Sequence, residues 1–141
     1  MHFDATTDIR ASADTVWRIL IDVESWPNWT ESMRAVQRLD SGEFAVGSRV
    51  EIHQPRLPSA IWTVTRMTPG VEFTWQARNP GLTTIAGHRL TERAGATRVH
   101  LTLDHNGPLS WAVGRATAGL TRRYLEMEAA GLAHRAEARP D

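Results

Sequence analysis

Cysteine and lysine are both absent from this sequence of 141 residues. Without cysteine the chain has no disulfide, no thiol nucleophile and no cysteine-ligated metal. Its sixteen basic residues, all arginine, are scattered and are balanced by sixteen acidic residues. A chain without net charge has no overall field to attract nucleic acid or anionic lipid. We therefore expect no nucleic-acid partner.

Long apolar runs and the common catalytic motifs are missing as well. No apolar stretch is long enough to span a membrane, and residues 1–4 do not begin a secretory signal. The sequence has no Gly-x-Ser-x-Gly, no phosphate-binding glycine loop, no dinucleotide fingerprint and no histidine pair at metal-ligand spacing. We expect a single cytoplasmic domain over residues 1–141, monomeric or homodimeric, with no membrane insertion, no metal and no cofactor.

The most informative segment that is present is Trp26-Pro27-Asn28-Trp29, which follows an amphipathic stretch. Pro27 disfavours the α-helical conformation at Trp26, so a preceding helix has to end here. Two tryptophans in such a corner have two interpretations. They plug the end of a sheet and anchor the turn, or they stack on a ligand at the mouth of a site.

Periodicity along the chain predicts the order of the elements. Residues 2–10 alternate as a strand, a helix runs from the Ser12 cap to about Ile21, and a short second helix forms the tryptophan corner. Six further strands are expected near residues 33–39, 48–54, 61–67, 71–78, 83–93 and 97–104. Apolar residues at helical spacing from Leu109 to Gly131, through Val113, Leu120 and Tyr124, predict a long C-terminal helix. This order indicates an α+β fold in which one long helix covers an antiparallel sheet of about seven strands.

Several motifs together resemble the START-like, helix-grip (SRPBCC) superfamily, in its branch of polyketide cyclase/dehydrase and lipid transport proteins. They are Ile9-x-Ala11-x-x-x-x-Val16-Trp17, Asp22-x-x-x-Trp26-Pro27-x-Trp29, Val46-Gly47-Ser48-Arg49, Trp62-x-Val64, Phe73-Thr74-Trp75, His88-Arg89-Leu90 and Tyr124-Leu125-x-x-Glu128-x-x-Gly131-Leu132. The resemblance covers nearly the whole chain. It implies a curved sheet wrapped around the C-terminal helix, with an internal cavity for a small hydrophobic partner such as a lipid, a polyketide or an aromatic metabolite.

The candidate ligand-binding residues are those that strand parity and helical spacing place toward such a cavity. They are Trp29, Ile52, Gln54, Trp62, Val64, Phe73, Trp75, His88, Leu101, Leu103, Val113, Leu120 and Tyr124. Each apolar member is equally typical of an ordinary packed core. Among the polar ones, His88, Gln54 and Tyr124 are expected to orient the ligand, whereas His53 and His100 are expected on the outer face.

Three functions remain open at this point. The first is a hydrophobic binding domain, and the second is a polyketide cyclase or dehydratase that uses the same cavity. In the enzyme, His88 with Tyr124 would transfer protons, which requires His88 inside the cavity beside a carboxylate or tyrosine partner. The third is an interaction module, which would have a filled core and an exposed apolar patch.

Overall fold

A computed structural model of the chain describes residues 1–138. After strand β1 (His2–Ile9) come helix α1 (Ala13–Ile21) and the 3-10 helix η1 (Val23–Asn28). Six strands follow: β2 (Ala35–Arg38), β3 (Arg49–His53), β4 (Ala60–Thr68), β5 (Glu72–Asn79), β6 (Leu82–Arg93) and β7 (Ala96–Asn106). Helix α2 (Ser110–Glu137) ends the described part of the chain. The order and number of elements predicted from the sequence are confirmed.

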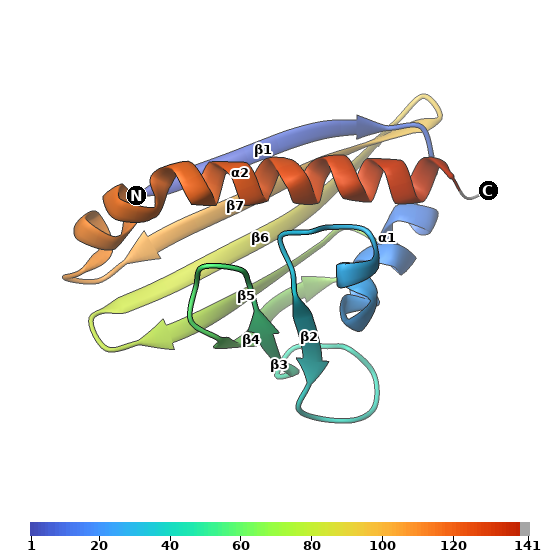
Figure 1. Ribbon diagram of the computed structural model, residues 1–141. Coiled ribbons are helices and arrows are strands. Elements are labelled where there is room, and N and C mark those ends of the chain that lie inside the picture. Colours follow the sequence, from blue (N-terminus) through green and yellow to red (C-terminus); the bar gives the residue numbers. More distant parts are fainter. Residues whose placement is uncertain (139–141) are drawn as a thin grey trace.

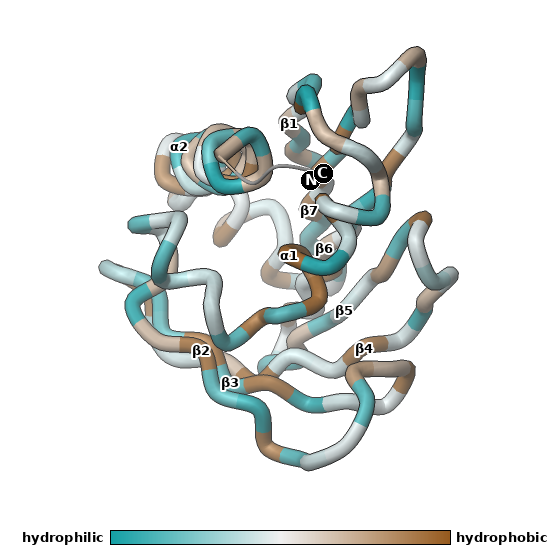
Figure 2. Tube along the Cα trace, turned by 90° about the vertical axis from the view of Figure 1, so that its right-hand side faces the viewer, coloured by the Kyte–Doolittle hydropathy of each residue, from teal (hydrophilic) through white to brown (hydrophobic). Residues whose placement is uncertain are grey.

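The seven strands form one antiparallel sheet in the order β1-β7-β6-β5-β4-β3-β2. Figure 1 shows α2 lying across this sheet, with α1 beneath its C-terminal end. Seen along α2, the strands curve from β1 round to β2 beneath the helix (Figure 2). This is the helix-grip fold. Because α2 packs most closely against β1, β7 and α1, it stands away from the middle of the sheet.

The tryptophan corner anchors the far end of α2. Trp26 is 1% exposed, and its indole Nε1 donates to the carbonyl of Leu20 at 2.9 Å, which joins the corner to the end of α1. Trp29 packs against Trp26 with ring centroids 5.4 Å apart. At Gly131 the helix backbone passes so close to Trp29 that a β-carbon there would lie 2.0 Å from the Trp29 carbonyl oxygen. The corner is therefore first a structural anchor.

The prediction of which face of α2 packs inward was right in part. Tyr124 is buried and Val113 lines the cavity as expected, whereas Leu120 and Gly131 are only half-buried. The buried residues of α2 are Gly114, Tyr124, Leu125, Glu128, Ala129, Leu132 and Ala136. Several of these are small or polar, so the apolar pattern revealed only part of the packed face.

Two glycines of α2 give a matched test of the anchor. Gly131→Ala should lower the free energy of unfolding by roughly 1–3 kcal/mol, because the added methyl group would push α2 off the Trp29 backbone. Gly119→Ala meets no atom within 4 Å and should raise it by about 0.5–1 kcal/mol through helix propensity. Urea denaturation of both variants measures the difference. Equal effects of the two substitutions would contradict the anchor.

Candidate functional site

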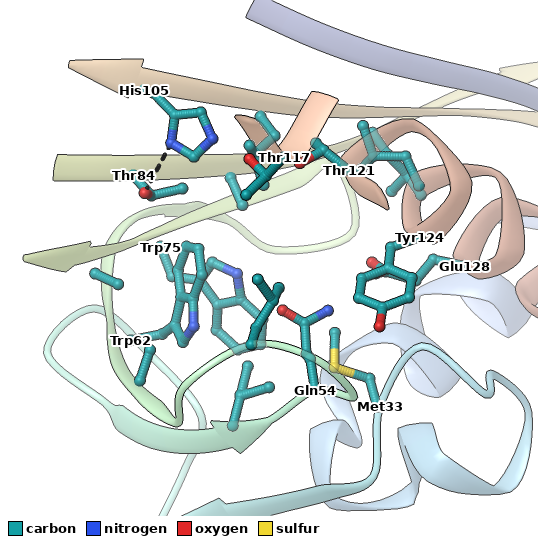
Figure 3. A pocket seen from close by; sticks show the side chains of 18 of the residues that line it. Met33, Gln54, Trp62, Trp75, Thr84, His105, Thr117, Thr121, Tyr124 and Glu128 are labelled. Carbon is teal, nitrogen blue, oxygen red and sulfur yellow. Dashed lines mark hydrogen bonds between the residues drawn. The ribbon is translucent and has the colours of Figure 1, made fainter. Parts of the chain in front are cut away.

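A cavity of about 240 Å³ lies between α2 and the concave face of the sheet. Trp62 of β4 and Trp75 of β5 form its aromatic floor, and Trp26 reaches it from the corner. The opposite wall belongs to one face of α2, which contributes Val113, Thr117, Thr121, Tyr124, Leu125 and Glu128. The segment between β3 and β4 borders the remaining side with Gln54, Leu57, Pro58 and Ser59. Figure 3 shows the amide of Gln54 pointing into the pocket.

Most of the residues proposed from the sequence lie on this wall. The structure brings together Ile52, Gln54, Trp62, Trp75, His88, Leu101, Leu103, Val113 and Tyr124. Four others are not part of the lining. Val64 and Phe73 are 1% and 0% exposed in the packed core, Trp29 packs on α2 at Gly131, and Leu120 lies beside the cavity-facing stripe of α2.

His88 lies inside the cavity wall and is neutral. The inward parity of β6 buries Thr84, Ala86 and His88 in turn. The His88 ring stacks on Phe73 at 4.1 Å, and its Nδ1 is 3.1 Å from the Phe73 carbonyl oxygen. Because a carbonyl can only accept, Nδ1 carries the proton and Nε2 is left as an acceptor. Burial lowers the pKa of His88 to about 4, against the opposing hydrogen bond to Phe73.

Glu128 is the site residue that sequence reasoning missed. It belongs to the motif quoted for the C-terminal helix, but a glutamate in a helix is normally exposed. Here it is 8% exposed and lines the cavity, and its Oε2 accepts a hydrogen bond from Ser32 at 3.2 Å. Burial raises the pKa of Glu128 to about 7, although the bond from Ser32 opposes this change. Its spacing of four residues from Tyr124, on the cavity side, was the available signal.

The other polar groups of the wall are held by the protein itself. The hydroxyl of Tyr124 donates to the backbone carbonyl of Pro55, which ties α2 to the segment after β3. On the opposite side of the pocket in Figure 3, His105 of β7 and Thr84 of β6 share a hydrogen bond of 3.0 Å. Burial and the nearby N-terminal ammonium lower the pKa of His105, while Asp104 opposes them. Both causes favour the uncharged form of His105.

The remaining histidines and possible metal ligands lie elsewhere. His100 pairs with Asp4 at 2.8 Å and His53 with Glu51 at 3.6 Å, all on partly exposed side chains away from the cavity. Within residues 1–138 no group of three or more acidic or histidine side chains is arranged to hold a metal ion. In the same range no helix is long and apolar enough to cross a membrane.

Comparison with known proteins places the chain in a family. The model of the family described as "Polyketide cyclase / dehydrase and lipid transport" matches residues 1–137. The chain belongs to this family. No curated protein matches its sequence. This match confirms the family resemblance that was seen in the sequence motifs.

Solved structures agree on the fold at low sequence identity. The Zhui aromatase/cyclase from Streptomyces sp. R1128 superposes with a TM-score of 0.80 at 19% identity, over 99% of this chain and 94% of that one. A START superfamily protein from Mycobacterium smegmatis gives 0.77 at 19% identity, over 97% of each chain. A hypothetical protein from Helicobacter pylori gives 0.82 at 9%, over 96% of this chain and 88% of that one. These likenesses establish the helix-grip architecture.

The raised pKa of Glu128 makes stability depend on pH. The folded protein holds this proton more tightly than the unfolded chain, so stability falls as pH rises from about 4.5 to about 7. We expect Glu128→Gln to remove this loss: the variant should match the wild type near pH 4 and exceed it by about 3 kcal/mol at pH 8. Denaturant unfolding at several pH values measures the two curves. A constant difference between them would contradict the assignment.

Glu128→Gln also makes the contribution of His88 to the pH dependence of stability easier to see. The lowered pKa of His88 changes stability in the direction opposite to that of Glu128. The unfolded chain binds the His88 proton more tightly, so stability is lost as pH falls from about 6.5 to about 4. In the wild type this change opposes that of Glu128 over much of the range. In Glu128→Gln that opposition is removed, and stability should fall steadily as pH falls through the combined effect of His88 and His105, whose pKa values are both lowered by burial. Stability that does not fall over this range would contradict the assignment.

Proposed function

We propose that the protein binds a small, mostly apolar molecule in the cavity between α2 and the sheet. The observation that carries the proposal is the cavity itself, which has aromatic walls and a few fixed polar groups. Such a composition is typical of small-molecule sites, in which apolar walls supply affinity and polar groups supply orientation. Affinity would come from buried area, at about 25 cal/mol per Å² before ordering costs.

The volume of the cavity limits the size of the ligand. An engineered protein cavity of about 150 Å³ binds benzene, whereas drug-sized pockets begin near 300 Å³. At about 240 Å³ the cavity fits a molecule with one or two rings or a short acyl chain. A whole phospholipid is too large for it. A cavity of this size also argues against the interaction module, which would have a filled core.

The cyclase or dehydratase is the second candidate, and one observation favours it. His88 presents an unprotonated Nε2 and Glu128 a carboxyl group to the same cavity, which are a proton acceptor and a proton donor. A poly-β-ketone held between them could close a ring by aldol addition and then lose water. Against this, the partner of His88 is a backbone carbonyl instead of a carboxylate or tyrosine. Binding without chemistry is therefore our first choice.

A cavity-filling substitution tests the binding proposal. Ala86 lines the cavity, and the adjacent Ile85 faces the outside of the same strand. Ala86→Phe should reduce the affinity for 2-acetylnaphthalene by more than about tenfold, because the new ring occupies the ligand's volume. Ile85→Phe should leave it unchanged. Quenching of the cavity tryptophans reports binding, and native mass spectrometry of the freshly purified protein shows any co-purified molecule. Equal affinity in both variants would place binding outside the cavity.

Two single substitutions, one of a cavity histidine and one of an exposed histidine, test the second candidate. If the protein is a cyclase, His88→Ala should abolish conversion of a short poly-β-ketone thioester, while the exposed His53→Ala should not change it. Mass spectrometry follows the loss of water from the substrate. In either case His88→Ala should alter ligand affinity only modestly. Conversion that survives His88→Ala would exclude His88 as the base, and no conversion by the wild type would leave binding as the function.

A further inference from the structure

The cavity contains no cation. Its lining includes no arginine from residues 1–138, and the chain has no lysine. Arg98 and Arg66, which pair with Asp8 and Glu72, have exposed side chains outside the cavity. The N-terminal ammonium donates to the carbonyl oxygen of His105 and is not part of the lining. A ligand anion would therefore lose its water without gaining a counterion.

The titratable groups that share the wall are His88 of β6, His105 of β7, and Tyr124 and Glu128 of α2. Burial shifts the pKa values of His88, His105 and Glu128 in the direction that favours their uncharged forms. From the segment before β2, the group that faces Glu128 is the uncharged Ser32, and from the segment after β3 the cavity receives the uncharged Gln54. Glu31, His134 and Arg135 border a separate shallow hollow behind Trp29.

The hydrogen bonds of Glu128 engage Oε2 and leave Oε1 as the oxygen that is open to a ligand. Ser32 donates to Oε2, and the hydroxyl of Thr30 lies 2.8 Å from the Ser32 hydroxyl, so a short chain of hydroxyls ends on this oxygen. Oε2 therefore acts as the acceptor of the carboxyl group. Among the described residues Oε1 has no hydrogen-bond partner, although the side chain lines the cavity. A proton on Oε1 is thus free to be donated to a ligand.

We propose that the cavity selects an uncharged ligand with a carbonyl oxygen, which accepts a hydrogen bond from Oε1 of protonated Glu128, and that it rejects carboxylates and phosphates. The inference rests on the proposed function and specifies its ligand class. Ionised Glu128 would lose its donor and add a buried negative charge. Because burial raises the pKa of Glu128 to about 7, affinity for the neutral ligand should fall as pH rises through that value.

Two ligands of nearly the same shape test the selection. In 2-acetylnaphthalene a methyl group occupies the place of one carboxylate oxygen of 2-naphthoate, so size and ring area are matched. At pH 6 we expect the wild type to bind the ketone at least about tenfold more tightly than the naphthoate, by calorimetry or tryptophan quenching. Equal or tighter binding of the naphthoate would overturn the inference while leaving the proposed function intact. Binding of neither compound would overturn both.

The pH dependence of ketone binding tests the role of Glu128 separately. Wild-type affinity should fall by about tenfold between pH 6 and pH 8. Glu128→Gln keeps a donor at the same place without a titratable proton, so its affinity should be constant over this range. A wild-type affinity that does not change with pH, or a variant that retains the full pH dependence, would remove Glu128 from the site.

Discussion

The contact of α2 with the tryptophan corner is the constraint on which the rest of the structure depends. Trp26 is locked to the end of α1, and Gly131 brings the helix backbone against the carbonyl of Trp29. At its other side α2 packs on β1 and β7. Supported at these places, the helix stands away from the middle of the curved sheet. The cavity exists because that space is not filled by side chains.

Burial has opposite consequences for the two ionisable side chains that matter most in the cavity. It keeps His88 unprotonated and Glu128 protonated, because in each case the charged form would lose its hydration. The result is a pocket in which both this proton acceptor and this proton donor are uncharged in mildly acidic solution. This combination favours neutral, oxygen-bearing molecules, and it would also serve proton transfer if a reactive ligand were bound.

The sequence predicted the fold well because strands and turns leave local signals. Alternation placed Ile52, Trp62, Trp75, His88 and Leu101 on the inner face, and glycine or proline marked most turns. On α2 it was right for Val113 and Tyr124 but did not reveal the threonine and glycine positions that also face inward. It missed Glu128 because a charge normally indicates a solvated position. Whether an inward residue lines a cavity, like Trp75, or is packed, like Phe73, depends on where α2 stands, which no local pattern encodes.

The contacts that hold α2 in place lie apart from the part of the helix that faces the cavity, and this affects how the site can change. Residues that hold the helix, such as Trp29 and Gly131, are largely different from those that determine what the cavity accepts, such as Gln54, Ala86 and Thr121. The second group can change with little cost to folding. Structures with the same architecture share only 9–19% of their residues with this chain. In a scaffold divided in this way, substitutions in the wall can change the ligand while the contacts that hold the helix in place remain.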